Sequence, residues 1–152
     1  MSGYTQLEDR LVSAWSGFEP PPLDRITTHK CSECDEIADY FGGTVWYDLT
    51  DINALRYHEV ALALFAPEAF HYYLPAFMRA TLRDPSGADV IPEGIMSSLE
   101  LELNSRSLRL ELFTAEQRRV VAQFLRALPE LQVAETDDVE ILALAMEIPS
   151  RP

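Results

Sequence analysis

The residues best suited to chemistry lie in the segment 29–34, with the sequence HKCSEC, where two cysteines are separated by two residues. A CxxC pair supplies half of the ligands of a tetrahedral zinc site, and His29 is placed to supply a third. No second CxxC and no HxxxH pattern is present, so His58 or His71 would have to be brought in by the fold. These residues support one of two functional hypotheses, the alternative one: a small zinc-binding protein that uses His29, Cys31 and Cys34.

A redox role for the same cysteines has less support. A thioredoxin-like CxxC follows a strand and opens a helix, and no alternating strand pattern precedes Cys31. The neighbouring acids also raise the pKa of a thiol, which opposes formation of a reactive thiolate. The simplest interpretation is a pair of reduced, partly buried cysteines at the start of a helix. We therefore predict that the protein has no cofactor.

The remaining patterns do not indicate catalysis. Glu68 and His71 form a single ExxH pair, whereas a di-iron bundle needs this pair twice, together with further carboxylates. A GxSxG nucleophile motif is absent from the sequence. Gly42-Gly43 is better explained as the end of a helix than as a phosphate-binding loop. We predict that the protein is not an enzyme.

The chain is strongly acidic, because 25 acidic residues against 12 basic ones give a formal net charge of −13. Binding to nucleic acid needs a basic surface, so this charge excludes it, whereas an acidic surface attracts a basic protein partner. The function predicted is a non-enzymatic binding module, such as an inhibitor or immunity protein that blocks a basic toxin or nuclease. The predicted partner-binding residues are Glu33, Asp35, Glu36, Asp39, Asp137, Asp138 and Glu140.

Length and composition predict one domain over residues 1–152, with an acidic C-terminal segment at 129–152. The first residues have no apolar core of a signal peptide, and the longest apolar run, Val60–Pro67, is too short to span a bilayer. Two cysteines cannot build a secreted disulfide framework. We expect a cytoplasmic protein that does not bind membranes; the oligomeric state stays open.

Capping signals and apolar periodicity predict a mainly α fold. Thr50 or Asp51 is expected to cap a helix, and Pro75 is expected to kink or break the helix that contains it. Three consecutive prolines at 20–22 predict an extended connection. The main helices are expected at Leu7–Trp15, Ser32–Phe41, Pro67–Leu82, Ala115–Leu128 and Thr136–Met146.

The segment 91–112 allows two structures. Leucines at 99, 101 and 103, and again at 108, 110 and 112, alternate with polar residues as in a β-hairpin. Leucine and glutamate favour a helix, however, and Ile91-Pro92-Glu93 is typical of a helix start. A hairpin at about 99–112 would make the fold α+β.

Three motifs resemble those of a family of short, uncharacterised bacterial proteins, a domain of unknown function. They are CSECDE at 31–36, followed by Phe41 and Trp46; PEAFHYYLPAF at 67–77; and TAEQR at 114–118, followed by Phe124-Leu125. The resemblance covers about residues 5–128 and implies that 91–103 is mainly helical, so we predict a helix there. It implies no activity.

Overall fold

The chain folds into α-helices, and the prediction of a mainly α architecture is confirmed. The computed structural model describes residues 4–105 and 108–147. The helices are α1 (Thr5–Ala14), α2 (Ser32–Phe41), α3 (Ile52–Tyr57), α4 (Ala61–Leu64), α5 (Pro67–Arg83), α6 (Pro85–Ala88), α7 (Ile91–Ser105), α8 (Ala115–Ala127) and α9 (Thr136–Glu147), with single 3-10 turns at Leu23–Arg25, Trp46–Asp48 and Leu108–Leu110.

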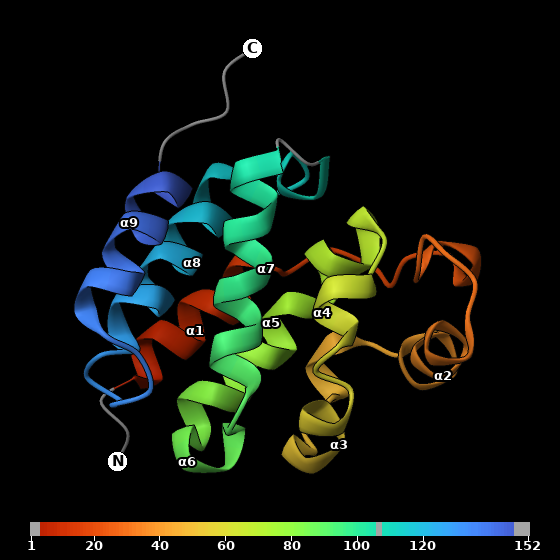
Figure 1. Ribbon diagram of the computed structural model, residues 1–152, viewed down its shortest axis with the longest axis horizontal. Helices are drawn as coiled ribbons and strands as arrows, with labels where there is room; N and C mark the ends of the chain where they lie inside the picture. Colours follow the sequence, from red (N-terminus) through yellow and green to blue (C-terminus); the bar gives the residue numbers. More distant parts are fainter. Residues whose placement is uncertain (1–3, 106–107, 148–152) are drawn as a thin grey trace.

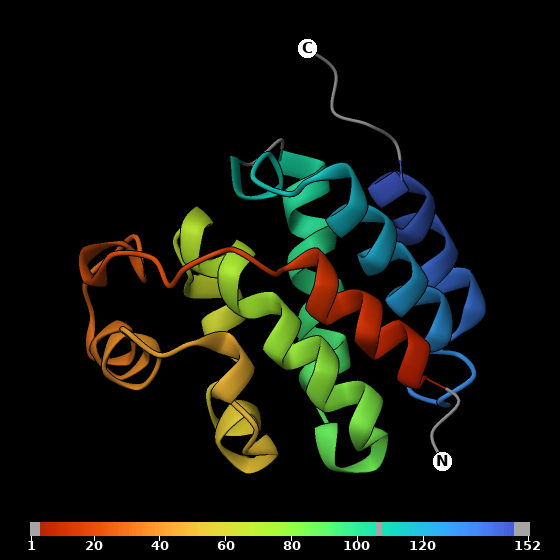
Figure 2. The same cartoon turned by 180° about the vertical axis from the view of Figure 1, so that it is seen from behind.

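Helix α5 lies at the centre of the molecule (Figure 1). Helices α1, α8 and α9 lie on one side of it, and α2, α3 and α4 lie on the other, which the view from behind also shows (Figure 2). Every residue of α5 from 69 to 82 is buried, so this helix is enclosed on all of its faces. Among the described residues, no helix combines the length and the apolar character needed to cross a membrane.

Pro75 lies inside α5, and the expected break does not occur. Proline has no N–H, so the carbonyl of His71, four residues earlier, loses its helical donor. The indole Nε1 of Trp15 donates to that carbonyl at 2.8 Å instead. A side chain from α1 thus replaces the missing backbone bond and fastens α1 to α5.

Residues 91–105 form the single helix α7, and the alternative hairpin is wrong, because no strand occurs within residues 4–105 and 108–147. The alternating leucines fit a helix because its period separates them by about 200° over two residues. Leu99 is fully buried, whereas Leu101 is 60% exposed. The pattern that looked like a strand is therefore an apolar helix with one leucine directed outward.

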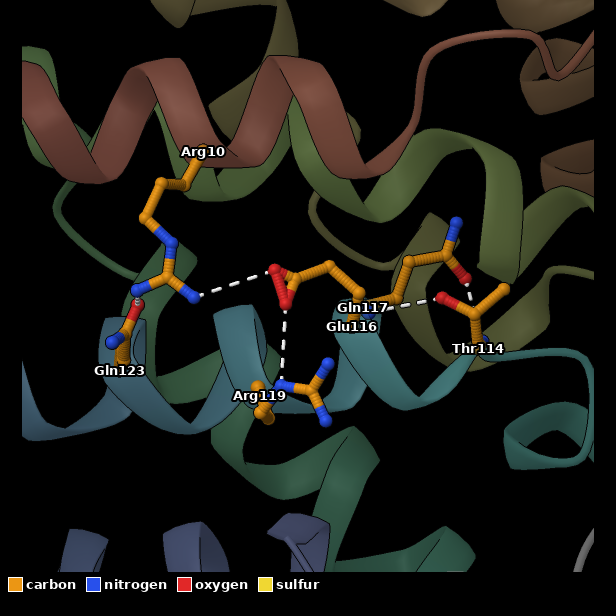
Figure 3. Close-up of polar contacts among 6 residues, drawn as sticks. All are labelled: Arg10, Thr114, Glu116, Gln117, Arg119 and Gln123. Atoms are coloured by element: carbon orange, nitrogen blue, oxygen red, sulfur yellow. Dashed lines mark hydrogen bonds and ion pairs between the residues drawn. The ribbon is translucent and has the colours of Figure 1, made fainter.

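Helix α8 begins at a capping box, as the sequence predicts. The Thr114 hydroxyl accepts from the Gln117 N–H at 3.0 Å, and the Gln117 side chain accepts from the Thr114 N–H at 2.9 Å. The same amide donates to the Ala14 carbonyl at 3.0 Å and so joins α8 to the end of α1. Arg10 of α1 also reaches Gln123 and Glu116 on α8 (Figure 3).

Candidate functional site

His29, Cys31 and Cys34 are brought together by the fold. The two sulfur atoms lie 3.1 Å apart, and Nδ1 of His29 lies 3.2 Å from the sulfur of Cys34. All three potential ligand atoms lie within 4.8 Å of one another. Cys34 is buried, Cys31 is half-buried and His29 is exposed, so the cluster lies at the surface with one side open to solvent.

Local backbone structure places these ligands. Cys31 is the N-cap of α2, with an extended backbone (φ −163°, ψ 171°), and its sulfur accepts from the Cys34 N–H at 3.2 Å. This geometry turns both sulfurs toward the same side of the helix end. The chain before them is held by an isolated bridge between Thr27 and Phe65 and by a 2.8 Å bond from the Ala66 N–H to the Ile26 carbonyl.

The environment of Cys34 favours the protonated thiol. Burial raises its pKa, and the neighbouring Cys31 raises it further by a hydrogen bond. A reactive thiolate is therefore disfavoured unless a cation is bound next to it. Asp35 makes a smaller contribution that also raises the pKa of Cys34, in the direction expected for acids near the motif.

The other two histidines do not complete the cluster. The ring of His58 stacks on Tyr40 with centroids 4.5 Å apart. His71 is buried and donates through Nε2 to the Gln117 side-chain oxygen at 2.7 Å, and burial lowers its pKa. Glu68 pairs with Arg25 at 2.8 Å instead of sharing a ligand site with His71. Among the described residues, no fourth histidine, cysteine or carboxylate joins His29, Cys31 and Cys34.

The predicted partner-binding acids fall into two separate groups. Glu33, Asp35, Glu36 and Asp39 are exposed on α2, whereas Asp137, Asp138 and Glu140 belong to α9. Helices α2 and α9 lie at opposite ends of the molecule (Figures 1 and 2), so the seven residues do not form one continuous surface.

The α9 group divides further. Glu140 pairs with Arg126 at 3.2 Å, so part of its charge is balanced within the chain. Asp137 and Asp138, by contrast, are exposed in the first turn of α9 and form no ion pair with a described basic residue.

Asp138 lines a groove that runs between α7, α9 and the loop before α9. Three adjoining hollows, of about 330, 590 and 370 Å³, share Asp138 and together form what we term the acidic groove. Their lining contains no basic residue. Ile141 lines the groove and is 75% exposed. Five exposed carboxylates line it, from Glu93, Glu100, Glu135, Asp137 and Asp138.

Three of these carboxylates, on Glu93, Glu100 and Glu135, were not predicted from the sequence. Glu93 and Glu100 are seven residues apart, a spacing that puts two side chains on the same face of a helix. That signal becomes readable only once residues 91–105 are assigned to a helix. Nothing in the sequence indicates that this face lies beside α9.

Three arginines are buried inside the fold rather than exposed on its surface. Arg79 is 2% exposed, and its guanidinium donates to the carbonyls of Tyr47 and Leu49 and lies 4.9 Å from the ring centroid of Trp46. Arg109 forms a buried ion pair with Glu102 at 2.6 Å. Arg118 is also buried. These contacts of Arg79 and Arg109 are thus with backbone carbonyls, an aromatic ring and the buried Glu102.

In the comparison with known families, the sequence model described as "Family of unknown function (DUF6714)" matches residues 20–146. The resemblance to an uncharacterised family is thereby confirmed, and the match extends through most of α9, beyond residue 128 where the motifs end. No curated protein and no solved structure matches the chain.

Proposed function

The chain belongs to the DUF6714 family, and we propose that it is a non-enzymatic module that binds a basic amphipathic helix of a partner protein in its acidic groove. The observation that carries this proposal is a groove with five exposed carboxylates, no lining base and an exposed isoleucine. In this proposal the basic partner binds on the α7–α9 side of the molecule rather than at both acidic groups.

Charge supports a basic occupant. At formal charge −13, the whole molecule attracts cations, and a groove that lacks bases concentrates this attraction. Electrostatic attraction raises the association rate more than it raises the final affinity. Binding at this site should therefore weaken as salt rises, because the Debye length shortens to about 8 Å at physiological ionic strength.

Apolar contacts support a helix rather than an extended basic tail. Ile141, Leu103 and Met96 lie along the groove. The two hollows that these residues line share Glu100 and Asp138. An amphipathic helix presents apolar residues at i, i+3, i+4 and i+7 along one stripe and flanks them with polar ones. Such a segment would bury the exposed isoleucine while its basic residues meet the carboxylates.

A module of this kind suits an inhibitor or immunity protein that covers a basic surface of a toxin or nuclease. Occlusion of such a surface requires no catalytic step. Only a complementary interface that forms quickly and dissociates slowly is needed.

Fluorescence anisotropy with a designed peptide tests the proposal. The probe is a labelled helix of about four turns, with leucines at helical spacing and arginines on the remaining positions. Neutralising two groove carboxylates, by Glu100→Gln with Asp138→Asn, should weaken binding about threefold to tenfold. Ile141→Ala, made on its own, should also weaken peptide binding. It should leave the salt dependence of binding unchanged, because it removes no charge.

Two controls separate docking in the groove from general attraction to an acidic protein. Glu33→Gln with Asp39→Asn removes the same charge from α2, at the other end of the molecule, and should leave the affinity nearly unchanged. A peptide of identical composition whose scrambled order destroys the apolar stripe should bind weakly. Equal loss in the α2 variant, or equal affinity for the scrambled peptide, would refute docking in the groove.

A further inference from the structure

The cluster at the N-terminus of α2 carries a second inference, independent of the acidic groove. We propose that His29 Nδ1, Cys31 Sγ and Cys34 Sγ bind one zinc ion, whose fourth coordination position faces solvent. The ligand atoms come from three residues within six positions of the chain and lie within 4.8 Å of one another.

The distances fit tetrahedral coordination after small shifts. Zinc bonds of about 2.3 Å to sulfur and 2.0–2.1 Å to nitrogen place two sulfurs about 3.8 Å apart, and a sulfur and a nitrogen about 3.6 Å apart. The corresponding separations here are 3.1 Å and 3.2 Å. An outward movement of a few tenths of an ångström per side chain brings these two pairs to the zinc distances. The remaining pair, a ring nitrogen of His29 and the sulfur of Cys31, lies within 4.8 Å, and rotation of the exposed His29 ring adjusts this separation.

The donor set selects the metal class. Two thiolates and an imidazole are soft or borderline ligands, which favour zinc and disfavour magnesium and calcium. The carboxylates nearby on α2 are exposed and add a favourable negative field around a divalent cation.

The open side distinguishes this site from a closed structural zinc site. Closed sites have four protein ligands, whereas three protein ligands leave a position for water or for a donor from another molecule. His58 and His71 are held by Tyr40 and Gln117, away from the cluster. A fourth ligand taken from solvent or from a bound molecule is therefore the arrangement that the described residues allow.

Bound zinc would also hold the connection between α1 and α2. Residues 26 and 27 are already joined to the α4–α5 region by the Thr27–Phe65 bridge and the Ala66–Ile26 bond. Coordination would join His29, which is exposed, to the capped end of α2. Metal binding should thus raise the thermal stability of the whole chain.

Cobalt titration of the full-length protein, stripped with chelator and reduced, tests the site directly. We expect one equivalent of Co²⁺ to produce thiolate-to-cobalt charge-transfer absorption, and one equivalent of Zn²⁺ to remove it. Protein purified without chelator should carry stoichiometric zinc by elemental analysis, and zinc should raise the melting temperature of the stripped protein.

Three variants assign the ligands. Cys31→Ser removes a metal ligand but keeps a good helix N-cap, so α2 should persist by far-UV circular dichroism while cobalt absorption is lost. His29→Ala changes an exposed side chain. Removal of a residue that only hydrogen-bonds a metal ligand typically weakens metal binding about 10–100-fold, so removal of His29, a direct ligand, should weaken zinc binding by more than this. Lys30→Ala, between the ligands, should bind zinc as the unaltered protein does.

Other results would overturn the proposal. One is the absence of charge-transfer absorption from reduced, folded protein. Another is a Cys31→Ser or His29→Ala variant that binds cobalt or zinc with unchanged affinity. A third is metal uptake that stays well below one equivalent while thiol counting finds both cysteines free.

Discussion

Replacement of Trp15 by phenylalanine tests how the central helix tolerates its internal proline. The Trp15 indole donates at 2.8 Å to the His71 carbonyl, which Pro75 leaves without a helical donor. Trp15→Phe keeps an aromatic ring in a site that is 1% exposed but removes the donor. If the Trp15 bond compensates for the proline, its removal should lower the free energy of unfolding less in a protein whose residue 75 has a backbone N–H.

The magnitude follows from two contributions. A buried carbonyl without a partner costs about 1–3 kcal/mol, and the smaller ring loses about 1 kcal/mol of burial. Trp15→Phe should therefore lower the free energy of unfolding by about 2–4 kcal/mol. In a Pro75→Ala background, the backbone N–H gained at position 75 can donate to the His71 carbonyl, so the first contribution should largely vanish. The expected coupling between the two sites is about 1–2 kcal/mol.

Urea denaturation of the four proteins in the cycle, followed by far-UV circular dichroism, measures this coupling. The m-values must agree for the comparison to hold. Trp46→Phe is a matched control, because the Trp46 indole stacks on Arg79 and takes no part in the bond to His71. It should be additive with Pro75→Ala. If the effect of Trp15→Phe is the same in both backgrounds within about 0.5 kcal/mol, the compensation argument is refuted.

Three further changes test other parts of the fold. Burial lowers the folded-state pKa of His71 below its unfolded value near 6.5, so the unfolded chain takes up the proton more readily and stability should fall as pH drops below about 6.5. The urea midpoint of His71→Gln should therefore decline less between pH 7 and pH 5 than that of the unaltered protein. An equal decline would contradict this. Arg79→Lys should destabilise the protein by about 2–3 kcal/mol in urea denaturation, because an ammonium group cannot reproduce the paired carbonyl bonds and ring stacking; a loss below about 0.5 kcal/mol would refute that role. Thr114→Ala should lower the melting temperature through a loss of about 1 kcal/mol at the α8 capping box, whereas Thr114→Ser should leave it nearly unchanged.

Helix positions could be predicted because their ends are encoded locally. Gly42-Gly43 ends α2, Pro67 begins α5, and the Thr114–Gln117 box begins α8. Gly43, at φ +75°, lies in the left-handed region that glycine favours after a helix end. Each signal depends on residues within one turn and needs no knowledge of the remaining chain.

The candidate sites show where local signals stop being sufficient. His29, Cys31 and Cys34 could be selected from sequence because they are neighbours in the chain. The acidic groove could not, because it depends on α7 packing beside α9, about forty residues later. The continuity of α5 through Pro75 likewise depends on Trp15, which is sixty residues away in sequence. Long-range packing of this kind has no periodic signature.

The enclosure of α5 has a consequence for the way the chain opens. A helix buried from residue 69 to 82 on every face cannot expose its amides by detaching one neighbour. Its N–H groups should therefore exchange with deuterium only when the whole domain unfolds, whereas the short α3 and α4 should exchange through local opening. The slowest amides of α5 would then report the global free energy of unfolding under native conditions. Exchange of the α5 amides should therefore serve as a measure of global stability for this chain.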